Sequence, residues 1–98
     1  MKKTYKFKSR QPFYDKERLD IKNNTVREID LNEDKFLELI QHMMNGFNDG
    51  DIQIRIINAD VEPYNLEKNT FVRDIRDISV YNDLMVITWN SDSTKEGK

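Results

Sequence analysis

The chain has 98 residues, a net charge of −2, a hydrophobic fraction of 37% and a charged fraction of 35%. That length fits one domain with a single thin core. The absence of cysteine excludes a disulfide framework, a thiolate nucleophile and a cysteine-based zinc site. No apolar run is long enough to span a membrane, and the N-terminus has no signal-peptide pattern. We therefore expect a cytoplasmic protein with one domain over residues 1–90 and a disordered polar tail over residues 91–98.

A strictly alternating segment over residues 4–9 predicts the first strand. Tyr5 and Phe7 fall on one side and Lys6 and Lys8 on the other, which is typical of a half-buried strand with a lysine-lined outer face. Lysines placed in this way also protect a sheet edge from pairing with another chain. The proline that follows ends the strand, and no element is predicted for Phe13 and Tyr14, next in the chain.

Residues 19–31 predict a hairpin around two asparagines. With a three-residue loop over 23–25, four apolar side chains share one face: Leu19, Ile21, Ile29 and Leu31. A two-residue loop would instead turn Ile29 outward and lose buried surface, so the longer loop is favoured.

Apolar residues at helical spacing predict a single helix over residues 32–47. The apolar positions of this stripe are Phe36, Ile40, Met43, Met44 and Phe47, widened by Leu37 and Leu39. Acidic residues at its start and Gly46 or Gly50 at its end agree with helix boundaries.

The second half of the chain predicts three more strands. Residues 51–57 alternate, with the isoleucines inward, and residues 58–70 form a long polar connection that contains several acids. Residues 75–89 read as a hairpin with a tight turn at Asn82 and Asp83, in which Tyr81 pairs with Leu84. The last strand is apolar on both sides, so we expect it to be central and covered above and below.

These elements predict an α+β fold in β-β-β-α-β-β-β order, with one packed helix. The sheet is expected to be mainly antiparallel, with five to six strands. A small OB-like barrel has a similar order and stays as an alternative, although barrels of that type usually have glycines where strands bend and this chain has three glycines in all.

The sequence contains no motif for catalysis, a cofactor or a metal. Neither glycine-rich phosphate-binding pattern is present, which argues against kinases, NTPases and dinucleotide enzymes. Asp49-Gly50-Asp51 resembles a fragment of a calcium loop, but the downstream ligand positions fail. His42 is the single histidine and the one candidate general base, and its place on the helix favours an ordinary surface role. We therefore expect a protein that is not an enzyme.

Charge is unevenly spread along the chain. The first 22 residues hold eight Lys and Arg against three Asp and Glu. Basic residues interleaved with aromatics are typical of single-stranded nucleic-acid binding, and the residues for such a site are Lys3, Lys6, Lys8 and Arg10. Because Tyr5 and Phe7 are expected to point inward, this function is the alternative and not the leading hypothesis.

The leading hypothesis is a small protein-interaction domain that acts as an accessory, regulatory or inhibitory factor. The candidate partner-binding residues lie at the long connection: Asp60, Glu62, Tyr64 and Glu67. An acidic loop of this length can steer the chain toward a protein partner. The Asn-, Ile-, Lys- and Asp-rich composition is typical of an AT-rich bacterium or its mobile elements, phages included, which is our hypothesis for the origin.

Overall fold

The computed structural model describes residues 3–11, 13–19, 22–60 and 69–90, which form a small α+β fold with a five-stranded mixed sheet and two helices. The elements are β1 (Lys3–Ser9), α1 (Phe13–Arg18), β2 (Asn24–Glu28), α2 (Asp34–Asn45), β3 (Ile52–Asn58), β4 (Thr70–Tyr81) and β5 (Leu84–Trp89). The strand order in the sheet is β1-β3-β4-β5-β2. The pair β1 and β3 is parallel, and the other three pairs are antiparallel.

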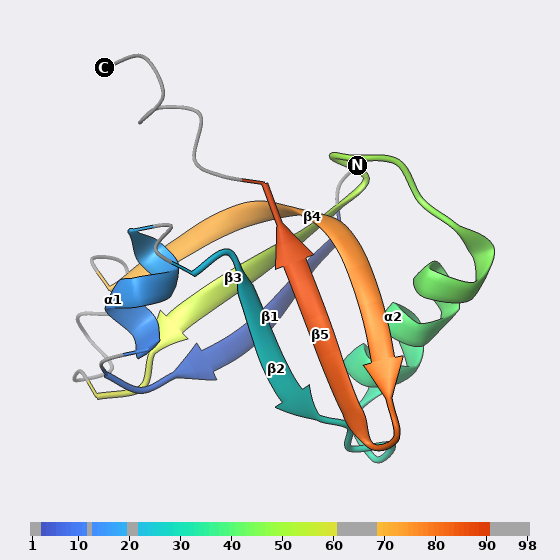
Figure 1. Cartoon of the computed structure of the whole chain (residues 1–98), viewed down its shortest axis with the longest axis horizontal. Helices are drawn as coiled ribbons and strands as arrows, with labels where there is room; N and C mark the ends of the chain where they lie inside the picture. Colours follow the sequence, from blue (N-terminus) through green and yellow to red (C-terminus); the bar gives the residue numbers. More distant parts are fainter. Residues whose placement is uncertain (1–2, 12, 20–21, 61–68, 91–98) are drawn as a thin grey trace.

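The sheet curls into a half-barrel around the twelve-residue strand β4. The first part of β4 pairs with β3 and the second part pairs with β5, with a register shift between Ile75 and Asp77. Such an irregularity bends a strand and increases its twist, so it lies where the two halves of the sheet meet. In Figure 1, α1 lies at one end of the curled sheet and α2 at the other.

The core fills the concave side of this half-barrel. Its fully buried members come mainly from β3, β4 and β5: Ile52, Ile54, Ile56, Ile75, Met85, Ile87 and Trp89. β1 adds Tyr5 and Phe7, and each helix contributes a buried aromatic residue, Tyr14 from α1 and Phe36 from α2. Burial of these side chains is the main driving force for folding.

The C-terminal hairpin is confirmed with its predicted register. Tyr81 pairs with Leu84, Val80 with Met85 and Ile78 with Ile87 across the turn. Asn82 takes a positive φ of 55°, which the tight turn requires and which asparagine tolerates better than most residues.

The strands predicted at residues 4–9 and 51–57 are also confirmed. In β1, Tyr5 and Phe7 are buried while Lys6 and Lys8 are exposed, and β1 lies at the edge of the sheet. In β3, the isoleucines alternate inward as expected.

The hairpin predicted at residues 19–31 is wrong. Residues 13–18 form α1, a second helix that the sequence did not reveal, and residues 20–21 lie outside the described part. Asn24, expected in the hairpin loop, instead begins β2, which pairs with β5. The main-chain N–H of Trp89 donates to the carbonyl of Asn23 (3.0 Å), so pairing with a distant strand has replaced the local turn. The observed element order is therefore β-α-β-α-β-β-β.

The predicted helix at residues 32–47 is confirmed as α2, although shorter at each end. Phe36 and Leu39 are buried, and Ile40, Met43 and Phe47 pack against the core. Met44 and Leu37 were expected on the same face, but both are exposed. Gly46, with φ of 80°, follows the last helical residue.

Within the described residues β1 and β2 are the two edges of one sheet, with no strand pairing between them. The closed-barrel alternative is therefore not confirmed. The single-domain boundary at residue 90 stays a prediction, and the tail over 91–98 lies outside the described residues. None of the helices in the described ranges is long and apolar enough to cross a membrane.

Removing a core side chain from β5 tests this architecture. We expect Ile87→Ala to lower the free energy of unfolding by about 2–5 kcal/mol, because Ile87 is fully buried. Thr88→Ala, on the outer face of the same strand, should cost less than about 1 kcal/mol. Urea unfolding followed by Trp89 fluorescence measures both, and equal small losses would show that β5 is misplaced.

Candidate functional site

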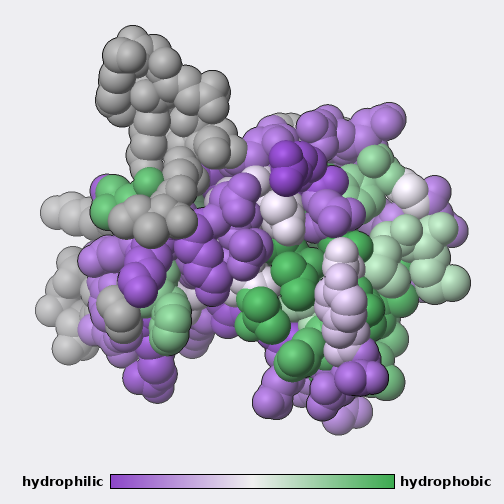
Figure 2. All heavy atoms as spheres, in the orientation of Figure 1, coloured by the Kyte–Doolittle hydropathy of each residue, from purple (hydrophilic) through white to green (hydrophobic). Residues whose placement is uncertain are grey.

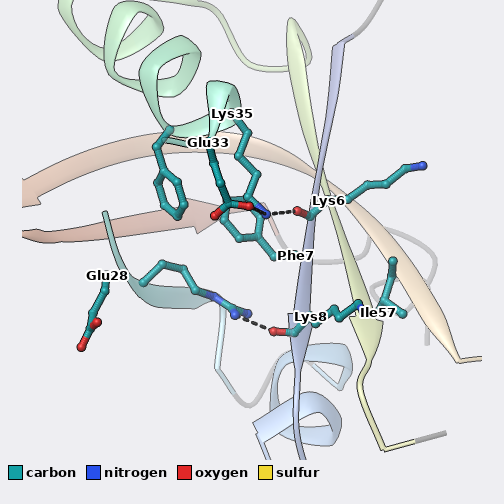
Figure 3. A pocket seen from close by; sticks show the side chains of 9 residues that line it. Lys6, Phe7, Lys8, Glu28, Glu33, Lys35 and Ile57 are labelled. Atoms are coloured by element: carbon teal, nitrogen blue, oxygen red, sulfur yellow. Dashed lines mark hydrogen bonds and ion pairs between the residues drawn. The ribbon is translucent and has the colours of Figure 1, made fainter. Parts of the chain in front are cut away.

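A cavity of about 540 Å³ lies between the two edge strands and the start of α2 (Figure 3). Its lining comes from β1, β2, β3 and the N-terminal end of α2: Lys6, Phe7, Lys8, Arg27, Glu28, Glu33, Lys35, Phe36 and Ile57. This volume falls in the range of about 300–1,000 Å³ that is typical of binding pockets. The cavity exists because the sheet curls without closing.

Two cationic side chains bind main-chain carbonyls on the open edge of β1. Lys35 Nζ, from α2, donates to the carbonyl of Lys6 (2.9 Å), and the Arg27 guanidinium, from β2, donates to the carbonyl of Lys8. The side chains of Lys6 and Lys8 project away from the cavity, as Figure 3 shows. These two lysines therefore offer the cavity their backbone, while Lys35 and Arg27 supply its positive charge.

Phe7 forms an apolar wall between these cations. Lys35 Nζ lies 4.3 Å from the centre of the Phe7 ring, and the Arg27 guanidinium lies 5.3 Å from it. Phe36 packs edge-on against Phe7, with 5.7 Å between ring centres. A cation over a ring face is stabilised by about 0.5–2 kcal/mol, so both cations are held at the mouth of an aromatic pocket.

Arg27 also reaches a second cavity, of about 410 Å³, on the side of α1. Its Nη2 donates to Ser9 Oγ (2.7 Å), and Ser9 in turn donates to Glu17 Oε1 (2.7 Å). Lys22 Nζ lies 3.7 Å from the other oxygen of Glu17, and Arg27 Nε donates to Thr25 Oγ1 (2.9 Å). Glu17 is only 1% exposed, so this network joins β1, α1 and β2 through a buried carboxylate.

The electrostatics of the network explain how the partly buried charge of Arg27 is tolerated. Burial lowers the pKa of Arg27 below its ordinary value, and the negative charge of Glu17 opposes that shift. A buried cation is tolerated when it is paired and hydrogen-bonded. Glu17 and the two oxygen acceptors on β1 meet that requirement.

Part of the outer face of β2, β5 and the end of β4 is apolar and exposed, with Glu28 and Ser79 beside it. Tyr81 is 67% exposed, Val26 49% and Leu84 37%, and Val86 lies between them in the sheet. Figure 2 views this face and shows hydrophobic residues gathered over these strands. We expected β5 to be covered on both sides, and this is wrong for the described residues, since both helices contribute their buried side chains to the concave side.

The candidate general base His42 packs against β1. Its Nε2 lies 3.1 Å from the hydroxyl of Tyr5, which donates to Glu38 Oε1 at the same distance. Burial, together with the bond to Glu38, raises the pKa of Tyr5 to about 12. The tyrosine therefore stays protonated at neutral pH, and the cluster joins α2 to β1 through polar contacts.

Three of the four basic residues predicted for nucleic acid follow one another along β1, and the fourth lies apart from them. Lys6 and Lys8 lie side by side on the outer face of β1, and Arg10 follows beside the second cavity. Lys3 lies at the other end of the strand, 3.5 Å from a carboxylate oxygen of Glu38.

The predicted partner-binding loop is described at its first residue alone. Asp60 accepts hydrogen bonds from Arg10 Nη1 (3.1 Å) and from the main-chain N–H of Gln11 (2.8 Å). This fixes the start of the loop beside the end of β1. Glu62, Tyr64 and Glu67 lie outside the described residues, so their role stays a prediction.

Sequence reasoning missed Arg27, Lys35, Glu17 and Val26. Each lies in a segment whose partner is distant in the chain, and Glu17 lies in a helix too short for periodicity to reveal. A carboxylate that occupies an inward helical position beside Tyr14 was the one available signal for the buried network.

Among the described residues, no three His, Cys, Asp or Glu side chains are grouped as metal ligands would be. No protein-family model, curated protein or solved structure matches the chain. The function must therefore be argued from the geometry of these surfaces.

The buried carboxylate can be tested by a change that keeps its shape. We expect Glu17→Gln to lower the free energy of unfolding by about 1–3 kcal/mol, because Arg27 and Lys22 lose their shared counter-charge. Glu28→Gln, on the exposed side of β2, serves as the control and should change it by less than about 0.5 kcal/mol. Urea denaturation at pH 7 measures both, and an unchanged midpoint for Glu17→Gln would contradict the role given to the network.

Proposed function

We propose that the chain is a small, non-enzymatic protein-interaction domain of an accessory, regulatory or inhibitory kind. The observation that carries this proposal is the open apolar face of β2, β5 and β4. A partner protein would bury that face as its contact.

Four apolar residues of this face adjoin one another in the sheet. Tyr81 pairs with Leu84 across the hairpin, and Val26 pairs with Val86 on the neighbouring strands. Contiguous exposed apolar surface on a small domain typically marks a site of interaction. Tyrosine is also enriched among the residues that dominate binding energy at protein interfaces.

The sequence gives this patch no obvious folding role. Val26 lies on the outer face of the short edge strand β2, and its neighbour Thr25 supplies the buried side chain there. A lysine or threonine at position 26 would fill the same place in the strand.

Single-stranded nucleic-acid binding is the alternative proposal. It is supported by the exposed lysines of β1 and by Phe13, which is exposed and has Lys22 Nζ 5.5 Å from its ring centre. Such binding depends on aromatic side chains on which bases can stack. Because Tyr5 and Phe7 are buried, the lysines of β1 have no aromatic platform within their own strand, and a protein partner is better supported.

Substitutions in the patch test the proposal directly. We expect Tyr81→Lys and Leu84→Lys each to abolish near-stoichiometric capture of a protein partner from host lysate, because a buried lysine would disrupt the contact. Met44→Lys replaces an apolar residue on α2 that is more exposed than either patch residue and should leave capture unchanged. Capture would be run with and without nuclease and read by mass spectrometry.

Two results would contradict this proposal. One is a retained protein that binds the two patch variants as well as the original chain. The other is retention that nuclease treatment removes, which would move the function to the basic surface of β1.

A further inference from the structure

The open edge of β1 presents regularly spaced backbone groups. The carbonyls of Lys6 and Lys8 both point toward the cavity, as their bonds to Lys35 and Arg27 show. In a strand, the N–H and the carbonyl of one residue point to the same side, so the amides of Lys6 and Lys8 face the cavity as well. This is the hydrogen-bonding pattern that an added strand requires.

Two side-chain cations bind the main-chain carbonyls that the N–H groups of an added strand would use. Lys35 Nζ and the Arg27 guanidinium each bind one carbonyl, two residues apart, where successive N–H groups of a neighbouring strand would lie. Lys35 is a flexible side chain whose carboxylate neighbour, Glu33, lies 3.7 Å away. An incoming backbone can therefore replace Lys35 without leaving a buried charge unpaired.

The residues on the two faces of β1 determine which side chains an added strand would need on each of its faces. On the inner side, Phe7 (Figure 3) and Phe36 line the cavity. On the outer side, Lys6 and Lys8 are exposed, and Arg55 of β3 lies next to Lys6. Directly opposed side chains in neighbouring strands interact favourably when their charges are opposite.

We infer that the open edge of β1 binds an extended segment of a partner protein in which apolar and acidic residues alternate. The apolar side chains enter the cavity beside Phe7, and the acidic ones lie against Lys6 and Lys8. The main-chain N–H groups of the segment bond to the open edge and take over the Lys6 carbonyl from Lys35, while Arg27 keeps its bond to the Lys8 carbonyl; such recognition is known as strand addition. This inference rests on the proposed function in one respect, namely that the partner is a protein.

A nucleic-acid strand fits the same edge less well. It would use the lysines but would leave the amides and carbonyls of the edge without strand partners. The backbone pattern and the alternation of surfaces both favour a peptide.

The probe is a short, fluorescein-labelled peptide of alternating valine and glutamate, with binding to the full chain measured by fluorescence anisotropy. Two further peptides isolate the features that matter. One has the same composition with its glutamates clustered, and the other carries N-methyl groups on alternate amides. We expect each change to weaken binding about tenfold, because the first removes the pairing with lysines and the second removes main-chain donors.

Variants of the protein give an independent readout. Lys6→Glu combined with Lys8→Glu should weaken binding of the alternating peptide about tenfold, since attraction becomes repulsion on the outer side. Lys16→Glu combined with Arg76→Glu makes the same change in net charge at exposed sites outside the cavity lining and should leave binding unchanged.

The inference is overturned by any of three results. These are no binding of the alternating peptide, equal binding of the clustered or N-methylated peptide, and tighter binding of oligothymidine than of the peptide. The proposed function is judged separately, because capture that depends on Tyr81 and Leu84 can persist when the peptide fails to bind. If the peptide binds but no such capture is seen, the edge site stands and the role proposed for the apolar patch is contradicted.

Discussion

Arg27 is the interaction on which the geometry of the half-barrel depends. It lies on the edge strand β2 and reaches the opposite edge strand, where it binds the Lys8 carbonyl and Ser9 Oγ. The sheet thus has its two edges joined by a side chain where a closed barrel would join them by backbone pairing. The buried carboxylate of Glu17 makes this arrangement tolerable, because it supplies the negative charge that a desolvated guanidinium needs. The same side chain lines both cavities.

Local patterns predicted the parts of the fold that local chemistry decides. Alternation identified β1 and β3, the turn at Asn82 set the register of β4 with β5, and helical spacing found α2. Pairings between segments distant in the chain were not predicted. β2 looked like half of a hairpin because two asparagines preceded it, yet its side chains are better buried against β5 than against its neighbour in the chain. The sequence pattern of β1 and of β3 does not indicate that the two strands pair in parallel.

The candidate site was predictable to a smaller extent. The lysines of β1 and their exposure could be read from alternation, but the cavity beside them could not, since Arg27 and Lys35 reach it from two other elements. The apolar character of β5 was correctly recognised, and its meaning was misjudged. A strand that is apolar on both sides indicates cover, and here the concave side receives the helices while the outer side stays open among the described residues. We interpret that open side as the place where a partner completes the structure.

The most direct test of this account is amide hydrogen exchange of the isolated protein, read residue by residue by NMR. If the edges are open, the amides of Lys6 and Lys8 in β1, and of Val26 in β2, exchange far faster than those of Ser79 and Val86, which pair across β4 and β5 in the middle of the sheet. Protection of these edge amides as strong as that of the central strands would show that β1 and β2 pair in solution. The chain would then be a closed barrel, and the open edge that the account requires would not exist.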